Sequence, residues 1–178
     1  MILNNYYNLR KASYSVPVGN TFFLTNPNLQ IALSDGTLYT ITTSECNGTD
    51  RLFRAASDYS AVYTSNPPTS GIGHINKYIV FGDGDTPVEL SDFSVSGNVI
   101  GNIGCTSMSG VYIENGIRYT YTFINRGSEA TIKEVCIFDN FTLNTTARKV
   151  ALWREVFDEP LTVGAGESFI YNFEYTQE

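Results

Sequence analysis

Residue types that commonly carry out catalysis are scarce in this chain. A Ser-His-Asp triad would have to use His74, which is the only histidine, and the sequence contains no Gly-x-Ser-x-Gly nucleophile motif. Cys46, Cys105 and Cys136 lie far apart, whereas a tetrahedral zinc site is normally built on a closely spaced cysteine pair. We therefore expect a loop histidine, small buried apolar cysteines, and no catalytic residue, metal or cofactor.

An acidic loop is the second candidate for chemistry. Residues 82–87 read Gly-Asp-Gly-Asp-Thr-Pro, and Asp83, Asp85, Glu89 and Asp92 together supply the hard oxygen ligands that Ca²⁺ prefers. The proline falls where the helix-loop-helix calcium motif needs a ligand, so we expect a solvated turn and keep calcium as the alternative. The Gly-x-Gly start of a dinucleotide fingerprint is also present, but acidic residues and proline would exclude a pyrophosphate.

Composition and charge exclude further classes of function. The 178 residues carry a net charge of −7 with only 11 Lys+Arg, so no cationic face for nucleic acid is expected. No apolar run is long enough to span a bilayer. The first residues lack the charged-then-apolar order of a signal peptide, so we expect a chain made in the cytoplasm and not exported by the usual route.

The elements that must position any site are predicted to be strands. Thr, Tyr and Phe are abundant, and hairpin signals stand at Asp-Gly 35–36 and Asn-Gly 115–116. Apolar and polar residues alternate through 117–123 and 169–175, which is typical of strands with one buried face. Further strands are predicted at 29–33, 38–41, 78–81, 93–100 with a bulge at Gly97, 132–138 interrupted at 133–134, and 150–157 closed by Pro160.

About ten short strands separated by turns predict an all-β fold, an antiparallel β-sandwich of immunoglobulin-like or jelly-roll type. One domain is expected over residues 15–178. The pattern does not decide between helix and strand at 50–63 and 145–157, although β-branched residues and Trp153 favour a strand at 150–157. Residues 66–73 (NPPTSGIG) are predicted to form a loop or hinge.

Residues 1–14 form a predicted N-terminal arm. Leu3, Tyr6, Tyr7 and Leu9 lie among polar residues without a clear period, and exposing them to water on a free arm would be costly. Two alternatives stay open at this point. The arm either packs on its own domain or lies on a neighbouring subunit.

The last hundred residues carry an ordered series of turn and strand motifs. They are Gly82-x-Gly84-x-x-Pro87, Ser91-Asp92-Phe93, Tyr119–Phe123 (YTYTF), Asn125–Ser128 (NRGS), Ile132–Val135 (IKEV), Leu152–Phe157 (LWREVF), Pro160, and Gly166–Ser168 (GES) before a final aromatic strand. This series, over residues 76–178, resembles the structural proteins of tailed bacteriophages, which are small β-sandwich subunits of the virion.

The resemblance implies a non-enzymatic virion protein, an auxiliary capsid, neck or tail component that packs against copies of itself and other virion proteins. The acidic loop departs from the small polar residues typical of that family, so a partner contacting Asp83 and Asp85 should be positively charged. The predicted subunit contacts are Leu3, Tyr6, Tyr7, Leu9, Asp83 and Asp85. The alternative is a carbohydrate-binding module of a fibre or surface protein, in which some of the 12 tyrosines and Trp153 would stack on sugars.

Overall fold

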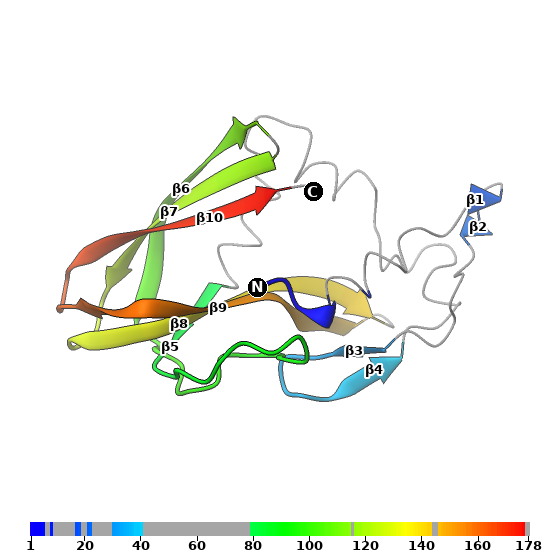
Figure 1. Ribbon diagram of the computed structural model, residues 1–178, viewed down its shortest axis with the longest axis horizontal. Coiled ribbons are helices and arrows are strands. Elements are labelled where there is room, and N and C mark those ends of the chain that lie inside the picture. Colours follow the sequence, from blue (N-terminus) through cyan, green and yellow to red (C-terminus); the bar gives the residue numbers. More distant parts are fainter. Residues whose placement is uncertain are drawn as a thin grey trace.

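The computed structural model describes residues 1–5, 8, 17–18, 21–22, 30–40, 79–114, 116–143 and 146–176 (Figure 1). This part of the chain is built of β-strands and loops, apart from helical residues at positions 4, 5 and 8. No helix among these residues is long and apolar enough to cross a membrane. The strands are β1 (Pro17–Val18), β2 (Thr21–Phe22), β3 (Gln30–Ala32), β4 (Leu38–Thr40), β5 (Ile79–Gly82), β6 (Ile103–Ile113), β7 (Gly116–Asn125), β8 (Ala130–Leu143), β9 (Thr146–Val163) and β10 (Ser168–Thr176).

Two three-stranded antiparallel sheets dominate the fold. The first has the order β5-β8-β9 and the second has the order β10-β7-β6. The alternation of β7 places Tyr119, Tyr121 and Phe123 in one buried cluster with Phe81 of the first sheet. The Phe81 ring meets that of Phe123 edge-on, with ring centroids 4.9 Å apart. Because both sheets contribute to this core, the all-β, sandwich-like fold predicted from the sequence is confirmed.

The predicted turns are found where glycine permits them. Gly36, in the β3–β4 turn, has a φ of 82°, and Asp35 Oδ1 accepts a hydrogen bond from the Thr37 N–H at 2.9 Å. Gly166, in the β9–β10 turn, has a φ of 75°. The β6–β7 hairpin predicted at Asn-Gly 115–116 is present, but its turn lies one residue earlier than this dipeptide, because Gly116 is the first residue of β7 and pairs with Ile113.

The long strand β9 corrects one prediction and confirms another. Residues 146–157 form a strand and not a helix, but Pro160 does not end it. In the β8–β9 pairing, Ile132 faces Leu161 while Glu134 faces Val156. The β9 residues between Val156 and Leu161 outnumber those between Glu134 and Ile132 on β8, so the pairing is irregular there. Pro160 lies in this irregular part and therefore does not interrupt a regular ladder of hydrogen bonds. Strand β8 likewise continues through residues 133–134.

The strand predicted at 93–100 is wrong. Among residues 83–102 only Val99 pairs as a strand residue, in an isolated bridge with Gly82. The backbone N–H groups of Ser96 and Gly97 instead donate to the Glu134 side chain, which removes them from any ladder. The predictions for 50–63 and 66–73, together with His74 and Cys46, lie outside the described residues.

Residues 83–102 cover the face of the first sheet that points away from the second sheet, as Figure 1 shows for the green segment below β5 and β8. Adjacent residues of β8 point to opposite faces of the sheet. Val135 and Ile137 join the core between the sheets, while Cys136 and Phe138 join a smaller cluster that contains Leu3. The first sheet is therefore buried on both sides.

Candidate functional site

The covered face of the first sheet contains a charged side chain from each of its two longest strands. Glu134 on β8 is completely buried, and Arg154 on β9 is 1% exposed. The register pairs Cys136 with Arg154 and Glu134 with Val156, so the two charged residues are diagonal neighbours across the ladder. Full burial of both charges requires each to be paired and hydrogen-bonded.

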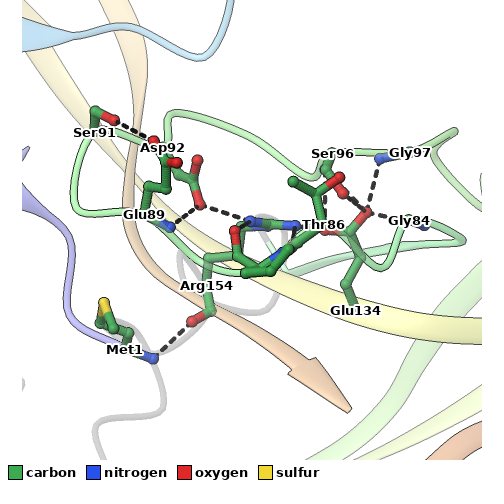
Figure 2. A network of polar contacts seen from close by, with 11 residues as sticks. Met1, Gly84, Thr86, Glu89, Ser91, Asp92, Ser96, Gly97, Glu134 and Arg154 are labelled. Atoms are coloured by element: carbon green, nitrogen blue, oxygen red, sulfur yellow. Dashed lines mark hydrogen bonds and ion pairs between the residues drawn. The ribbon is translucent and has the colours of Figure 1, made fainter. Parts of the chain in front are cut away.

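Arg154 uses its whole guanidinium group (Figure 2). Nε donates to Glu134 Oε2 at 2.8 Å, and Nη2 lies 2.7 Å from the same oxygen. Nη1 donates to Asp92 Oδ2 at 2.6 Å. Nη2 also donates to the Thr86 carbonyl at 2.9 Å, and Nη1 lies 3.5 Å from the Pro87 carbonyl. Burial by itself would lower the pKa of Arg154, but the hydrogen bonds to Asp92 and Glu134 outweigh it and raise the pKa.

The Glu134 carboxylate is surrounded by donors from residues 84–97. Oε1 accepts from the N–H groups of Gly84 (3.1 Å), Ser96 (2.9 Å) and Gly97 (2.8 Å), and from Ser96 Oγ (3.2 Å). A Cβ atom on Gly84 would lie 2.4 Å from Glu134 Oε1 and 2.2 Å from Ser96 Oγ. Glycine is therefore required where the loop backbone approaches the carboxylate.

Asp92 connects the cluster to the tip of the loop. Its Oδ2 accepts from the Glu89 N–H at 2.9 Å, and its own N–H donates to the Glu89 carbonyl at 3.1 Å. Glu134, Arg154 and Asp92 therefore form a clasp that ties residues 84–97 to the sheet. We call these three residues the clasp.

The clasp can hold the loop in place, because its ion pairs and hydrogen bonds join the loop to the first sheet. Its buried polar atoms face donors or acceptors of the protein, and the loop covers them from solvent. Within the described ranges, no group of three or more His, Cys, Asp or Glu side chains could hold a metal ion. The calcium alternative for the acidic loop gains no support, because Asp92 is directed at Arg154.

The predicted acidic contacts lie on the surface of the loop. Asp83 is exposed and accepts from the Asn98 N–H at 2.7 Å and from its Nδ2 at 3.2 Å; these bonds lower the pKa of Asp83. Asp85 is also exposed and pairs with Lys133 Nζ at 2.9 Å, which lowers the pKa of Asp85. Hydrogen bonding therefore favours the charged forms of both carboxylates.

Exposed apolar side chains accompany these acids. Leu90 is 49% exposed, Phe93 is 41% exposed and Val99 is 58% exposed. We call these three exposed apolar residues, together with the exposed Asp83 and Asp85, the loop face. All five belong to residues 83–99, the segment that the clasp ties to the first sheet.

Of the predicted arm contacts, Leu3 is the one that the described residues include. Leu3 is completely buried in the small cluster of its own chain, and its N–H donates to the Leu152 carbonyl of β9 at 2.9 Å. Residues 1–5 are thus part of the folded domain in this structure. Tyr6, Tyr7 and Leu9 lie outside the described residues.

The clasp was not predicted from the sequence, although a signal for it exists. Glu134 interrupts the apolar run 132–138, and Arg154 interrupts the apolar run 150–157. A charged residue inside a strand buried on both faces needs a partner, and opposite charges on two such strands could have been matched. Nothing in the local pattern indicated which residues of the loop would join them.

Comparison with protein family models, curated proteins and solved structures found no significant match to this chain.

Proposed function

We propose that this protein is a non-enzymatic structural protein of a tailed-phage virion, an auxiliary capsid, neck or tail component that packs against copies of itself and other virion proteins. The observation that carries the proposal is that the buried charges of Glu134 and Arg154 hold a surface loop in place. The clasp ties residues 84–97 to the first sheet and so holds the loop that presents the loop face to solvent.

A pre-ordered surface suits an assembly protein. Ordering a mobile loop at the moment of binding costs free energy that would otherwise appear as affinity. Here the hydrogen bonds of Glu134 and Arg154 order residues 84–97 before any partner arrives. Leu90, Phe93 and Val99 then supply apolar area, while Asp83 and Asp85 favour a partner with a positively charged rim.

The carbohydrate-binding alternative receives less support. Tyr119, Tyr121, Phe123 and Tyr171 are buried in the core, where they stack on one another and not on a ligand. Trp153 packs edge-on against Phe173 of β10, with ring centroids 5.3 Å apart. The four buried side chains are therefore unavailable as flat sugar platforms, and Trp153 is half-buried. Binding to a glycan array by the intact protein would revive this alternative.

The test of the proposal is self-association measured by light scattering over a concentration series. Leu90→Ser combined with Val99→Ser should weaken association about 10- to 100-fold, because each change removes roughly 1 kcal/mol or more of apolar burial at an interface. Val111→Ser with Ile170→Ser is the matched control, since these side chains are 53% and 63% exposed on the second sheet.

The control pair should associate like the unmodified protein. A protein that stays monomeric at every concentration would count against assembly through its own copies. Equal weakening by both pairs of substitutions would show that the loop face has no special part in association.

A further inference from the structure

Four side chains with polar groups meet in the core between the two sheets. They are Trp153 and Glu155 of β9, Tyr121 of β7 and Tyr171 of β10. The β8 residues that pair with Trp153 and Glu155 both belong to the core between the sheets, and Tyr121 and Tyr171 pair with each other in the second sheet. These four side chains, which we call the core polar cluster, therefore join the inner faces of both sheets.

One hydrogen bond within the core polar cluster is complete. The Tyr171 hydroxyl donates to Glu155 Oε2 at 3.0 Å. Because a carboxylate only accepts, this bond uses the hydroxyl hydrogen of Tyr171 and leaves lone pairs on its oxygen. Burial raises the pKa of Tyr171, and the charge of Glu155 and the hydrogen bond to it raise this pKa further, so the hydroxyl stays protonated.

The other two polar atoms of the cluster are buried without a partner. Among the described residues, Tyr121 Oη and Trp153 Nε1 have no hydrogen-bond partner. Both nevertheless act on the pKa of Tyr171, which the Tyr121 hydroxyl raises and the Trp153 indole N–H lowers, so they lie near the Tyr171 hydroxyl. Leaving a buried donor unpaired is costly, and such groups in folded proteins normally bond to protein or to ordered water.

The packing of the core is looser around the two tyrosines than around its phenylalanines. The rings of Phe81 and Phe123 have centroids 4.9 Å apart. In contrast, the Tyr121 ring lies 6.0 Å from that of Phe123, and the Tyr171 ring lies 6.1 Å from that of Phe81. Room for a small molecule is therefore expected at the tyrosine end of the core.

The chemistry of the cluster selects the kind of molecule. An indole N–H only donates, so the partner of Trp153 must accept, which excludes a cation. The nearby Glu155 carboxylate disfavours an anion. A partner that accepts from Trp153 and Tyr121 and also donates to the lone pairs of Tyr171 must be neutral and able to do both. Water is the smallest molecule with these properties.

We propose that a buried water molecule binds Tyr121 Oη and Trp153 Nε1 and so links the inner faces of the two sheets. Its oxygen accepts from the indole N–H and the Tyr121 hydroxyl, and a hydrogen is donated to the Tyr171 oxygen. The water adds a second polar link to the direct bond between Tyr171 and Glu155. This inference concerns the fold of one chain and does not depend on the proposed function.

The first test is Tyr121→Phe in the intact protein, with stability measured by urea unfolding. If Tyr121 binds the water, removing its hydroxyl takes away a hydrogen bond, and the unfolding equilibrium constant should rise roughly 5- to 30-fold. If the hydroxyl is simply unpaired, removing it should leave stability unchanged or raise it, and that result overturns the proposal. Tyr171→Phe is the matched control, because it removes a hydroxyl whose hydrogen bond to Glu155 is present in the structure.

The second test is a crystal structure of the unmodified protein at a resolution that orders buried waters. A water oxygen about 2.7–3.2 Å from both Tyr121 Oη and Trp153 Nε1 is the expected result. The same water should be absent or weaker in crystals of Tyr121→Phe. A protein side chain in its place, or a direct bond from the Trp153 indole N–H to the Tyr171 oxygen with no water beside it, would overturn the proposal even if Tyr121→Phe were destabilising.

Discussion

Replacing Glu134 by glutamine tests whether the clasp holds the fold together. The substitution keeps the shape of the side chain but removes its charge and turns one acceptor oxygen into an NH₂ donor. Oε2 faces the guanidinium of Arg154 and Oε1 faces the N–H groups of Gly84 and Gly97, so either orientation of the amide directs a donor at donors. We expect a large loss of stability.

The magnitude follows from burial. Glu134 is completely buried and Arg154 is 1% exposed, and breaking one side of a buried ion pair costs about 3–5 kcal/mol. For a chain of 178 residues this corresponds to a fall in Tm on the order of 10 °C. Part of the loss is expected as disorder of residues 84–97, whose backbone donors lose their common acceptor.

The assay is urea unfolding followed by fluorescence of Trp153, the only tryptophan, which is half-buried against the core. Glu174→Gln is the control, because Glu174 pairs with Arg118 on the surface, where the side chains are 44% and 47% exposed. An exposed pair of this kind contributes about 0–1 kcal/mol. If Glu134→Gln lost no more stability than the control, the clasp would not be holding the loop.

Three further outcomes are expected. Gly84→Ala should destabilise the protein by at least about 2 kcal/mol in the same assay, because its Cβ would overlap Glu134 and Ser96. Gly101→Ala, which has open space around its Cβ, should change the stability little. Equal effects of the two substitutions would contradict the close approach of the loop backbone to Glu134. The pKa of Asp83 is lowered in the folded protein, so its contribution to stability is present above about pH 4 and is lost as the pH falls through the folded pKa. Asp83→Asn should therefore flatten the fall in unfolding free energy at acidic pH. An unchanged pH profile would count against this contribution. Burial raises the pKa of Cys136, so its thiol should resist alkylation until the protein unfolds. Alkylation is followed by mass spectrometry. Rapid labelling of the native protein would show that the small cluster around Leu3 and Cys136 is open to solvent.

Strand type and turn position were predictable because they depend on neighbours in the sequence. The alternation through 117–123 required one wet and one buried face, and β7 has that pattern. The Asp-Gly turn places Gly36 in the left-handed region, with a φ of 82°, and the Asn-Gly signal located the β6–β7 hairpin to within one residue. The all-β class followed from the number and spacing of such signals.

Predictions failed where a distant side chain competed with the local pattern. Residues 93–100 alternate like a strand, but their backbone donors bind Glu134, a residue more than thirty positions later. Pro160 should end a strand by local rules, yet it lies where the β8–β9 register shifts and no ladder bond is lost.

The sequence by itself therefore determined most of the strands that the structure describes, where most of them turn, and that strands with alternating residues must bury one face. Only the tertiary structure decided that the first sheet is covered on its second face, that Glu134 and Arg154 meet there, and that residues 1–3 pair with the edge of β9 beside them. The reason is physical. Backbone pattern and turn geometry are set over a few residues, whereas a buried charge or an open sheet edge is satisfied by whichever group the fold brings near, at any separation along the chain.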